Sequence, residues 1–183
     1  MAELKHTIVA LVEDRPGVLN RVASLFRRRG FNIASLAVGH SEQPNLSRMT
    51  FVVEGDDETV EQVTKQLYKL IDVVKVSELS EEEIVARELA LIRVKSTATT
   101  RSEIMQLVDI FRADIVDVGP QSLVIQVTGD EEKIDALHQL LKPFGVREIM
   151  RTGRVAMMRG ATEAKPGRTR TDTNGTGANA GED

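Results

Sequence analysis

Apolar and polar positions along the first eighty residues change their period several times, and each change predicts a new element. Thr7 to Val12 is a short apolar run typical of a buried strand, and Asp14 to Gly17 then forms a turn. A helical repeat follows and ends at Gly30; its apolar positions are Val18, Leu19, Val22, Leu25 and Phe26. Two further strands are predicted, over Phe31–Val38 and around Met49–Val53. A helix over Val60–Ile71 and a last strand over Val73–Val76 follow. This order, βαββαβ, is the ferredoxin-like arrangement.

The same order of elements is expected a second time. Ala90, Ile92 and Val94 alternate as in a strand, and Thr100 to Glu103 fits a capping box before a helix that reaches Phe111. The remaining elements are two strands, a helix and a last strand, over Ile115–Val118, Leu123–Val127, Ile134–Leu141 and from about Val146. The junction Gly129-Asp130-Glu131-Glu132 repeats Gly55-Asp56-Asp57-Glu58, where the acids favour helix starts.

The predicted fold class is therefore α+β, with two ferredoxin-like βαββαβ units. Residues 1–79 form the first unit, 80–87 an acidic linker containing Ser80-Glu81-Glu82-Glu83, and 88–159 the second unit. Beyond Met158 the sequence has no Val, Ile, Leu, Met or aromatic residue. Such a segment cannot bury enough apolar surface to offset its ordering entropy, so a disordered tail is predicted over 160–183.

Composition excludes several classes of function. The chain has no cysteine, which excludes disulfides and thiolate chemistry, and its net charge of −4 gives no reason to expect nucleic acid as a partner. No apolar run is long enough to span a membrane, so a cytoplasmic protein is expected. The three histidines, His6, His40 and His138, are not at metal-ligand spacing. No nucleophile, base and oxyanion site come together, which predicts that the chain is not an enzyme.

The loop Asp14-Arg15-Pro16-Gly17 is the informative site. Gly17 permits close approach of a ligand, and the N–H groups at the start of the following helix could hold a small carboxylate. The alternative is a plain capped turn, with Asp14 as the N-cap and Pro16 and Gly17 as turn formers. On these residues alone the capped turn is the favoured interpretation.

The stretch from Asp14 to Leu19, inside a βαββαβ unit, resembles the opening of ACT domains, which are small-molecule sensors that commonly bind amino acids. Several longer stretches resemble the regulatory (small) subunit of acetolactate synthase, also called acetohydroxyacid synthase. They are Arg29–Ile33, Leu46–Thr50, Glu61–Gln62, Lys65–Leu70, Asp72–Val76, Ile110–Arg112 and Ile115–Val118. The resemblance covers about residues 5 to 160.

This resemblance implies a homodimer that holds valine, or a related branched-chain amino acid, between two ACT units. Gly17 and Val18 would present backbone N–H groups to the effector carboxylate, and an acid at Asp14 could attract its ammonium group. Pro16 and Leu19 complete that loop, and Asn32 and Ile33 would reach the effector from the facing chain.

The resemblance also implies a large catalytic partner subunit that carries thiamine diphosphate, magnesium and FAD. That partner would condense pyruvate with pyruvate or 2-oxobutyrate in branched-chain amino-acid biosynthesis. This chain would hold no cofactor or metal; it would activate the partner and confer feedback inhibition. The second unit has Thr99-Thr100-Arg101-Ser102 in place of the Pro-Gly loop, which predicts partner contact or tuning of sensitivity. The alternatives are a free-standing amino-acid sensor acting on another enzyme or on transcription, and a structural assembly protein.

Overall fold

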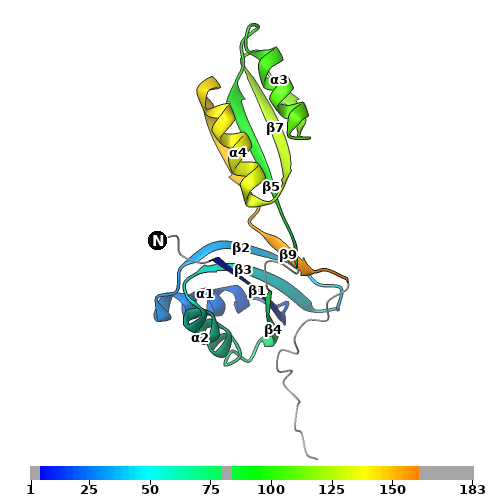
Figure 1. Ribbon diagram of the computed structural model, residues 1–183. Helices are drawn as coiled ribbons and strands as arrows, with labels where there is room; N and C mark the ends of the chain where they lie inside the picture. The colour runs from blue at the N-terminus through cyan, green and yellow to red at the C-terminus, as the bar shows by residue number, and fades with distance from the viewer. Residues whose placement is uncertain (1–4, 80–83, 161–183) are drawn as a thin grey trace, which may run out of the picture.

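The computed structural model describes residues 5–79 and 84–160, which form two α+β units joined by extended chain (Figure 1). The first unit contains β1 (Lys5–Glu13), α1 (Val18–Arg29), β2 (Ile33–His40), β3 (Leu46–Glu54), α2 (Asp57–Leu67) and β4 (Val73–Leu79). The second contains β5 (Ile84–Lys95), α3 (Arg101–Ile110), β6 (Asp114–Val118), β7 (Ser122–Gly129), α4 (Glu131–Leu141), a 3₁₀ turn (Lys142–Phe144) and β8 (Val146–Arg151). A last strand, β9 (Val155–Met158), returns to the first unit.

Both units have the same antiparallel sheet topology, β2-β3-β1-β4 and β6-β7-β5-β8, which confirms two ferredoxin-like folds. In each unit two helices contact one another and cover one face of the sheet. The predicted periodicity is confirmed for Val18, Val22, Leu25 and Phe26 of α1, which are buried in the first core. Leu19, predicted on the same face, is 46% exposed. β1 is buried on both of its faces, which explains why its sequence is an apolar run rather than an alternation.

Two helix starts agree with the sequence and a third does not. Asp56 and Asp130 accept hydrogen bonds from the N–H groups three residues later and cap α2 and α4. The predicted capping box at Thr100 is wrong, because Thr100 Oγ1 accepts instead from the N–H of Thr97, and no side chain caps α3. The predicted end of the second helix is also wrong: α2 ends at Leu67, and Ile71 beyond it is 70% exposed.

The connection between the units is a two-stranded ribbon rather than a plain linker. Ile84–Arg87, assigned to the acidic linker 80–87 from sequence, are the first residues of β5 and pair antiparallel with β9. The ribbon covers the face of the first sheet opposite α1 and α2. There Ile84, Ala86, Ala156 and Met158 form a small cluster with Val9 and Leu79. β9 was not predicted from the sequence.

The remaining predicted segments, Ser80 to Glu83 of the linker and the tail from residue 161, lie outside the described residues. Among the helices of the described chain, none has the length and apolar character needed to cross a lipid bilayer.

Candidate functional site

The loop between β1 and α1 ends on a glycine in the left-handed conformation. Gly17 has φ +88° and is the N-cap residue of α1, so Asp14 does not cap the helix and that part of the capped-turn interpretation is wrong. Among the described residues no side chain caps α1, and the carbonyl of Gly17 accepts from the N–H of Arg21 at 3.0 Å. The first N–H groups of a helix have no intrahelical acceptor, so this turn offers donors to a small anion.

A buried carboxylate under the loop fixes its shape. Asp72, which is 1% exposed, accepts from Arg15 Nε at 2.9 Å and from Arg15 Nη2 through the same oxygen. Its other oxygen lies 3.3 Å from Arg21 Nη1, an ion pair without hydrogen-bond geometry. The hydrogen bond with Asp72 raises the pKa of Arg15 above its ordinary value, and the charges of Asp72 and Glu13 act in the same direction. Arg15 of the loop and Arg21 of α1 are thus both tied to Asp72, directly before β4.

The other predicted residues of the loop differ in what they expose. The side chain of Val18 is buried in the core, so only its backbone faces the loop, and its N–H donates to the carbonyl of Arg15 at 3.4 Å. Pro16 and Gly17 are exposed, and Leu19 is 46% exposed beside them. Asp14 pairs with His40 of β2 at 3.0 Å, and its N–H donates to the carbonyl of Asn45.

Asn32 and Ile33 lie at the start of β2, at the opposite end of the sheet from Asp14. Asn32 Nδ2 donates to Glu54 Oε2 at 2.5 Å, and Ile33 packs against the first core. Ile33 is aligned with Val53 and His6, near the start of β1, whereas Asp14 follows its end. The 12-residue helix α1 separates the two groups by about 18 Å. A single chain therefore does not bring the seven predicted site residues together.

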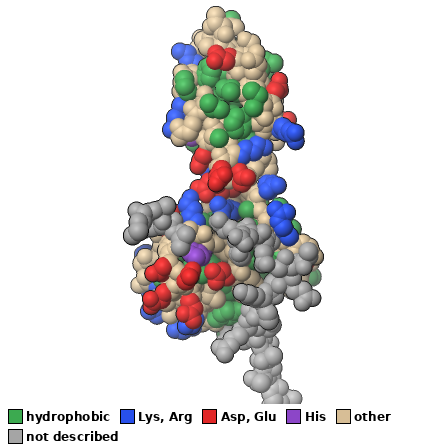
Figure 2. All heavy atoms as spheres, in the orientation of Figure 1, with side chains coloured by type: hydrophobic (Ala, Val, Ile, Leu, Met, Phe, Trp, Pro, Cys, Tyr) green, Lys and Arg blue, Asp and Glu red, His purple; other side chains and the backbone are tan. Residues whose placement is uncertain are grey.

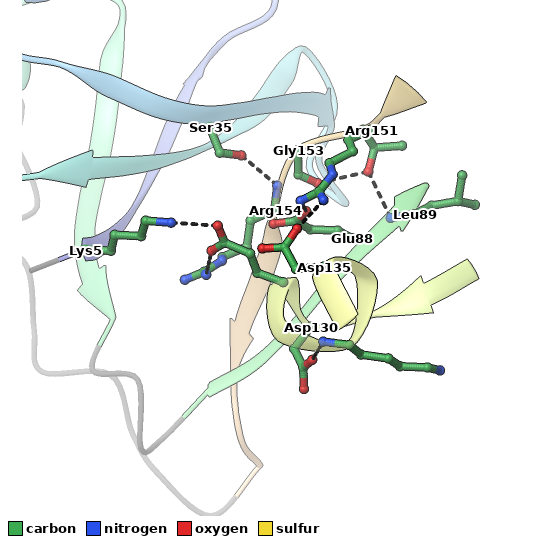
Figure 3. Close-up of polar contacts among 12 residues, drawn as sticks. Lys5, Ser35, Glu88, Leu89, Asp130, Asp135, Arg151, Gly153 and Arg154 are labelled. Carbon is green, nitrogen blue, oxygen red and sulfur yellow. Dashed lines mark hydrogen bonds and ion pairs between the residues drawn. The ribbon is translucent and has the colours of Figure 1, made fainter. Parts of the chain in front are cut away.

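A second polar cluster lies where the two units meet (Figures 2 and 3). Glu131 at the start of α4 accepts from Lys5 of β1 at 2.6 Å and from Arg154 Nη2 at 3.0 Å. Arg154 also donates its N–H to Ser35 Oγ at 2.8 Å and contacts Thr7 Oγ1. These contacts join β1 and β2 of the first unit to α4 of the second.

Glu88 lies at the same joint and is only 7% exposed. It forms an ion pair with Arg151 at 4.0 Å, while Arg151 also pairs with Asp135. Burial raises the pKa of Glu88, and the nearby charge of Glu131 raises it further, while Arg151 and Arg154 lower it. Neither the contact of Asp72 with the loop nor this joint was predicted from the sequence. Asp72 carried one signal, an acid inside the apolar stretch Leu70 to Val74, but the joint depends on contacts between distant segments.

The second unit's own loop before α3 differs from the first. The hydroxyls of Thr97 and Thr100 lie 3.0 Å apart, and Arg101 donates to Ser96 Oγ and to the carbonyl of Gly119. The polar groups of this loop therefore already have hydrogen-bond partners within the second unit. Within the described residues, no group of three or more His, Asp or Glu side chains is arranged to hold a metal ion.

Comparison with known proteins assigns both units. Residues 8–75 match the family model "AHAS small subunit-like ACT domain", and residues 87–160 match "Small subunit of acetolactate synthase". A probable acetolactate synthase small subunit from Archaeoglobus fulgidus is 60% identical over 157 residues, which cover 86% of this chain and 98% of the relative. The chain belongs to the acetolactate synthase small-subunit family.

Two further relatives agree with this family. The acetolactate synthase small subunit of Mycolicibacterium smegmatis is 56% identical over 155 residues, covering 85% of this chain and 91% of the relative. The crystal structure of the small subunit from Thermotoga maritima superposes with a TM-score of 0.81 at 49% identity, covering 85% of this chain and 98% of that one. The first unit is therefore an ACT domain of the small-subunit type, and the resemblance inferred from sequence is confirmed.

Proposed function

We propose that this chain is the regulatory subunit of an acetolactate synthase and binds valine, or a related branched-chain amino acid, between two ACT domains. The observation that carries the proposal is the glycine N-cap at Gly17, which leaves the first turn of α1 without a side-chain cap. Family membership supports the partner: a small subunit implies a large catalytic one.

The arrangement of the candidate residues favours a site shared by two chains. Within the described residues β2 pairs only with β3, so its other edge can pair with a second copy. Antiparallel pairing about a two-fold axis places the start of one β2 beside the end of the other. Because His40 at the end of β2 contacts Asp14, this pairing brings Asn32 and Ile33 of one chain toward the Gly17 loop of its partner.

The chemistry of valine fits the two halves of this site. Its carboxylate would accept from the N–H groups at the start of α1, and its ammonium would face the carboxylate of Asp14. The isopropyl group would pack against Ile33 and Leu36, which lie beside the first core. Two-fold symmetry gives two such sites in each dimer.

Regulation then follows from differential binding. An effector alters activity only if it binds one arrangement of the assembly more tightly than another. A coupling of about 1–3 kcal/mol to the catalytic subunit gives roughly 5- to 150-fold control. In this proposal the thiamine diphosphate, magnesium and FAD belong to the catalytic subunit, and this chain contributes none of the reacting groups.

Calorimetric titration with valine tests the effector site. We expect saturable heat from the wild-type chain and none from Gly17→Asp, which places a negative charge at the carboxylate position. Gly145→Asp is the matched control: Gly145 also has positive φ, +94°, and its nearest neighbour is also 3.7 Å from the added Cβ. The backbone cost of about 1–2 kcal/mol is then shared by both variants.

The two variants separate strain from ligand binding. Equal loss of heat in Gly17→Asp and Gly145→Asp would contradict a local effector site, as would full valine inhibition of the holoenzyme that contains Gly17→Asp. Co-purification with a thiamine-diphosphate enzyme distinguishes a regulatory subunit from a free-standing amino-acid sensor.

A further inference from the structure

An apolar groove of about 380 Å³ lies between the second half of β2 and the ribbon strand β9. Val38, Val155 and Met157, which line it, are 48%, 53% and 69% exposed. Three apolar side chains exposed side by side indicate a surface that another protein surface covers.

The described part of the chain leaves these three side chains exposed. Residues 161–183, which come after β9 in the sequence, contain no Val, Ile, Leu, Met or aromatic side chain with which to cover an apolar groove. A surface on a second molecule can supply such side chains.

The charges around the groove indicate what the occupant carries. Arg48 and Arg87 lie on its lining; Arg48 pairs with Glu42, whereas Arg87 forms no ion pair among the described residues. The only hydrogen bond of the Arg87 side chain within those residues is to the carbonyl of Ala86. The matching surface should therefore offer an acidic group.

Such a surface lies on the same chain, at the other end of β2. A cavity of about 490 Å³ there is lined by Ala34, Ser35 and Leu36 of β2 and by the carboxylates of Glu54, Glu88 and Glu131. Its cations are already engaged, Lys5 with Glu131 and Arg151 with Asp135. Among the described residues Glu54 forms no ion pair, and Glu88 forms one only at 4.0 Å. Glu131 also pairs with Arg154, and the raised pKa of Glu88 disfavours its charge, so Glu54 is the carboxylate of this cavity that is open to an arginine of a partner.

Two-fold symmetry brings the groove and the cavity together. The groove contains residues 37–40 of β2, and the cavity contains residues 34–36. Antiparallel pairing of two β2 strands about a two-fold axis at Ala37, a register of the dimer on which the proposed function rests, sets residues 38–40 of one chain opposite 34–36 of the other. The arginine-lined groove of each chain then faces the acidic cavity of its partner, and the contact occurs twice.

We propose that a second copy of this chain covers the groove, so that β9, together with Arg87, forms a dimer contact beyond the ACT sheets. In this proposal β9, which follows the second unit and packs on the first, has two roles. It covers the first sheet of its own chain and holds the partner chain. Residues 1–79, predicted from sequence to carry dimerisation, then supply only part of the interface.

Sedimentation equilibrium of the full chain tests this contact. Met157→Asp should raise the dimer dissociation constant by at least tenfold, because it places a charge in the apolar contact. Met150→Asp is the matched control, since Met150 is a methionine of similar exposure, 61%, on β8 of the second unit. The control should dimerise like the wild type.

Arg87→Glu is a second variant that tests the same dimer contact through its charge rather than through the apolar side chains. Its expected effect is a severalfold weaker dimer, with Arg147→Glu, an exposed arginine of β8, unchanged. Circular dichroism and the melting temperature check that each variant is folded.

The outcomes distinguish this contact from the proposed function. A wild-type chain that is monomeric at all concentrations overturns both. A stable dimer that Met157→Asp and Arg87→Glu leave unchanged overturns the β9 contact alone. If Met157→Asp dimerises normally but no longer activates the catalytic subunit, the groove binds that subunit and the present proposal is wrong.

Discussion

Two buried carboxylates in this protein have opposite electrostatic surroundings. Asp72 lies under the loop Asp14–Gly17, between Arg15 and Arg21, so its charge is compensated on both oxygens. Glu88 lies between the units. There the negative charges of Glu131 and Asp135 offset much of the stabilisation that Arg151 and Arg154 give to its ionised form. A charge buried without close compensation costs stability, so the ionised form of Glu88 is unfavourable in the folded protein.

The sign of this effect on stability can be derived from the pKa of Glu88. Because the folded pKa is raised, folding favours the protonated form. The stabilising contribution of Glu88 to the free energy of unfolding is fully present below its unfolded pKa of about 4.3. It is lost as pH rises through the folded pKa. Glu88→Gln should therefore melt at nearly the wild-type temperature near pH 4 and at a higher temperature near pH 8.

Melting curves of both proteins at the two pH values check this prediction. Glu132→Gln, which removes an exposed carboxylate from the first turn of α4, is the control and should not show the same gain at pH 8. A wild-type protein that remains the more stable one at pH 8 would mean that the ion pair with Arg151 outweighs the burial of Glu88.

Among the secondary-structure elements, those with a local hydrophobic signal were predicted from the sequence. The alternation in β3 and β7 and the helical spacing in α1 and α4 arise because one face of each element packs on its own unit's core. The end of α2 was misplaced because Leu70 and Ile71 continue the apolar pattern, although Ile71 is exposed after the helix has ended.

β9 could not be recognised from its own four residues. The four residues of β9, Val155 to Met158, do not alternate between apolar and polar. The strand exists because it pairs with Ile84–Arg87, about seventy residues earlier. The candidate site shows the same limit: the loop from Asp14 to Gly17 was predicted, but its anchor Asp72 was not, because that contact is made only on folding.

The approach of β9 to the first sheet depends on Gly153. Its φ is +84°, and a Cβ there would lie 2.9 Å from both the carbonyl oxygen of Leu36 and Ser35 Oγ. Gly153→Ala should cost about 1–3 kcal/mol and loosen the joint between the units. Hydrogen exchange at Arg154, whose N–H donates to Ser35, measures the loosening.

Gly160→Ala is the control for this change, because no atom of the described residues lies within 4 Å of its added Cβ. Equal exchange rates at Arg154 in the wild type and in Gly153→Ala would show that the contact with β2 does not hold the joint.

At the scale of the whole molecule, the first unit covers one face of its sheet with its own helices but depends on residues outside the unit to cover the other face. Val9 and Leu79 are covered by Ile84, Ala86, Ala156 and Met158, all of which lie outside residues 5–79. A chain limited to residues 5–79 should fold around its main core but lose roughly 2–4 kcal/mol, because two aliphatic side chains lose their cover.

Urea unfolding of this shortened chain and its binding of an apolar dye check the prediction, with the full chain as the reference. Increased dye binding and a lower urea midpoint are expected. A shortened chain that binds no more dye than the full chain would show that the ribbon adds nothing to the first unit.

The ribbon also gives the molecule the topology of one domain inserted into another. The chain leaves the first unit along β5 and comes back along β9, and Arg87 stands directly opposite Val155. Everything between these two positions occupies what would otherwise be the turn of a hairpin. A two-residue Asn-Gly turn has the geometry to join them. Fusion at this point would remove the second unit and keep the ribbon residues that cover Val9 and Leu79, so in topology the second unit is an insertion within the ribbon.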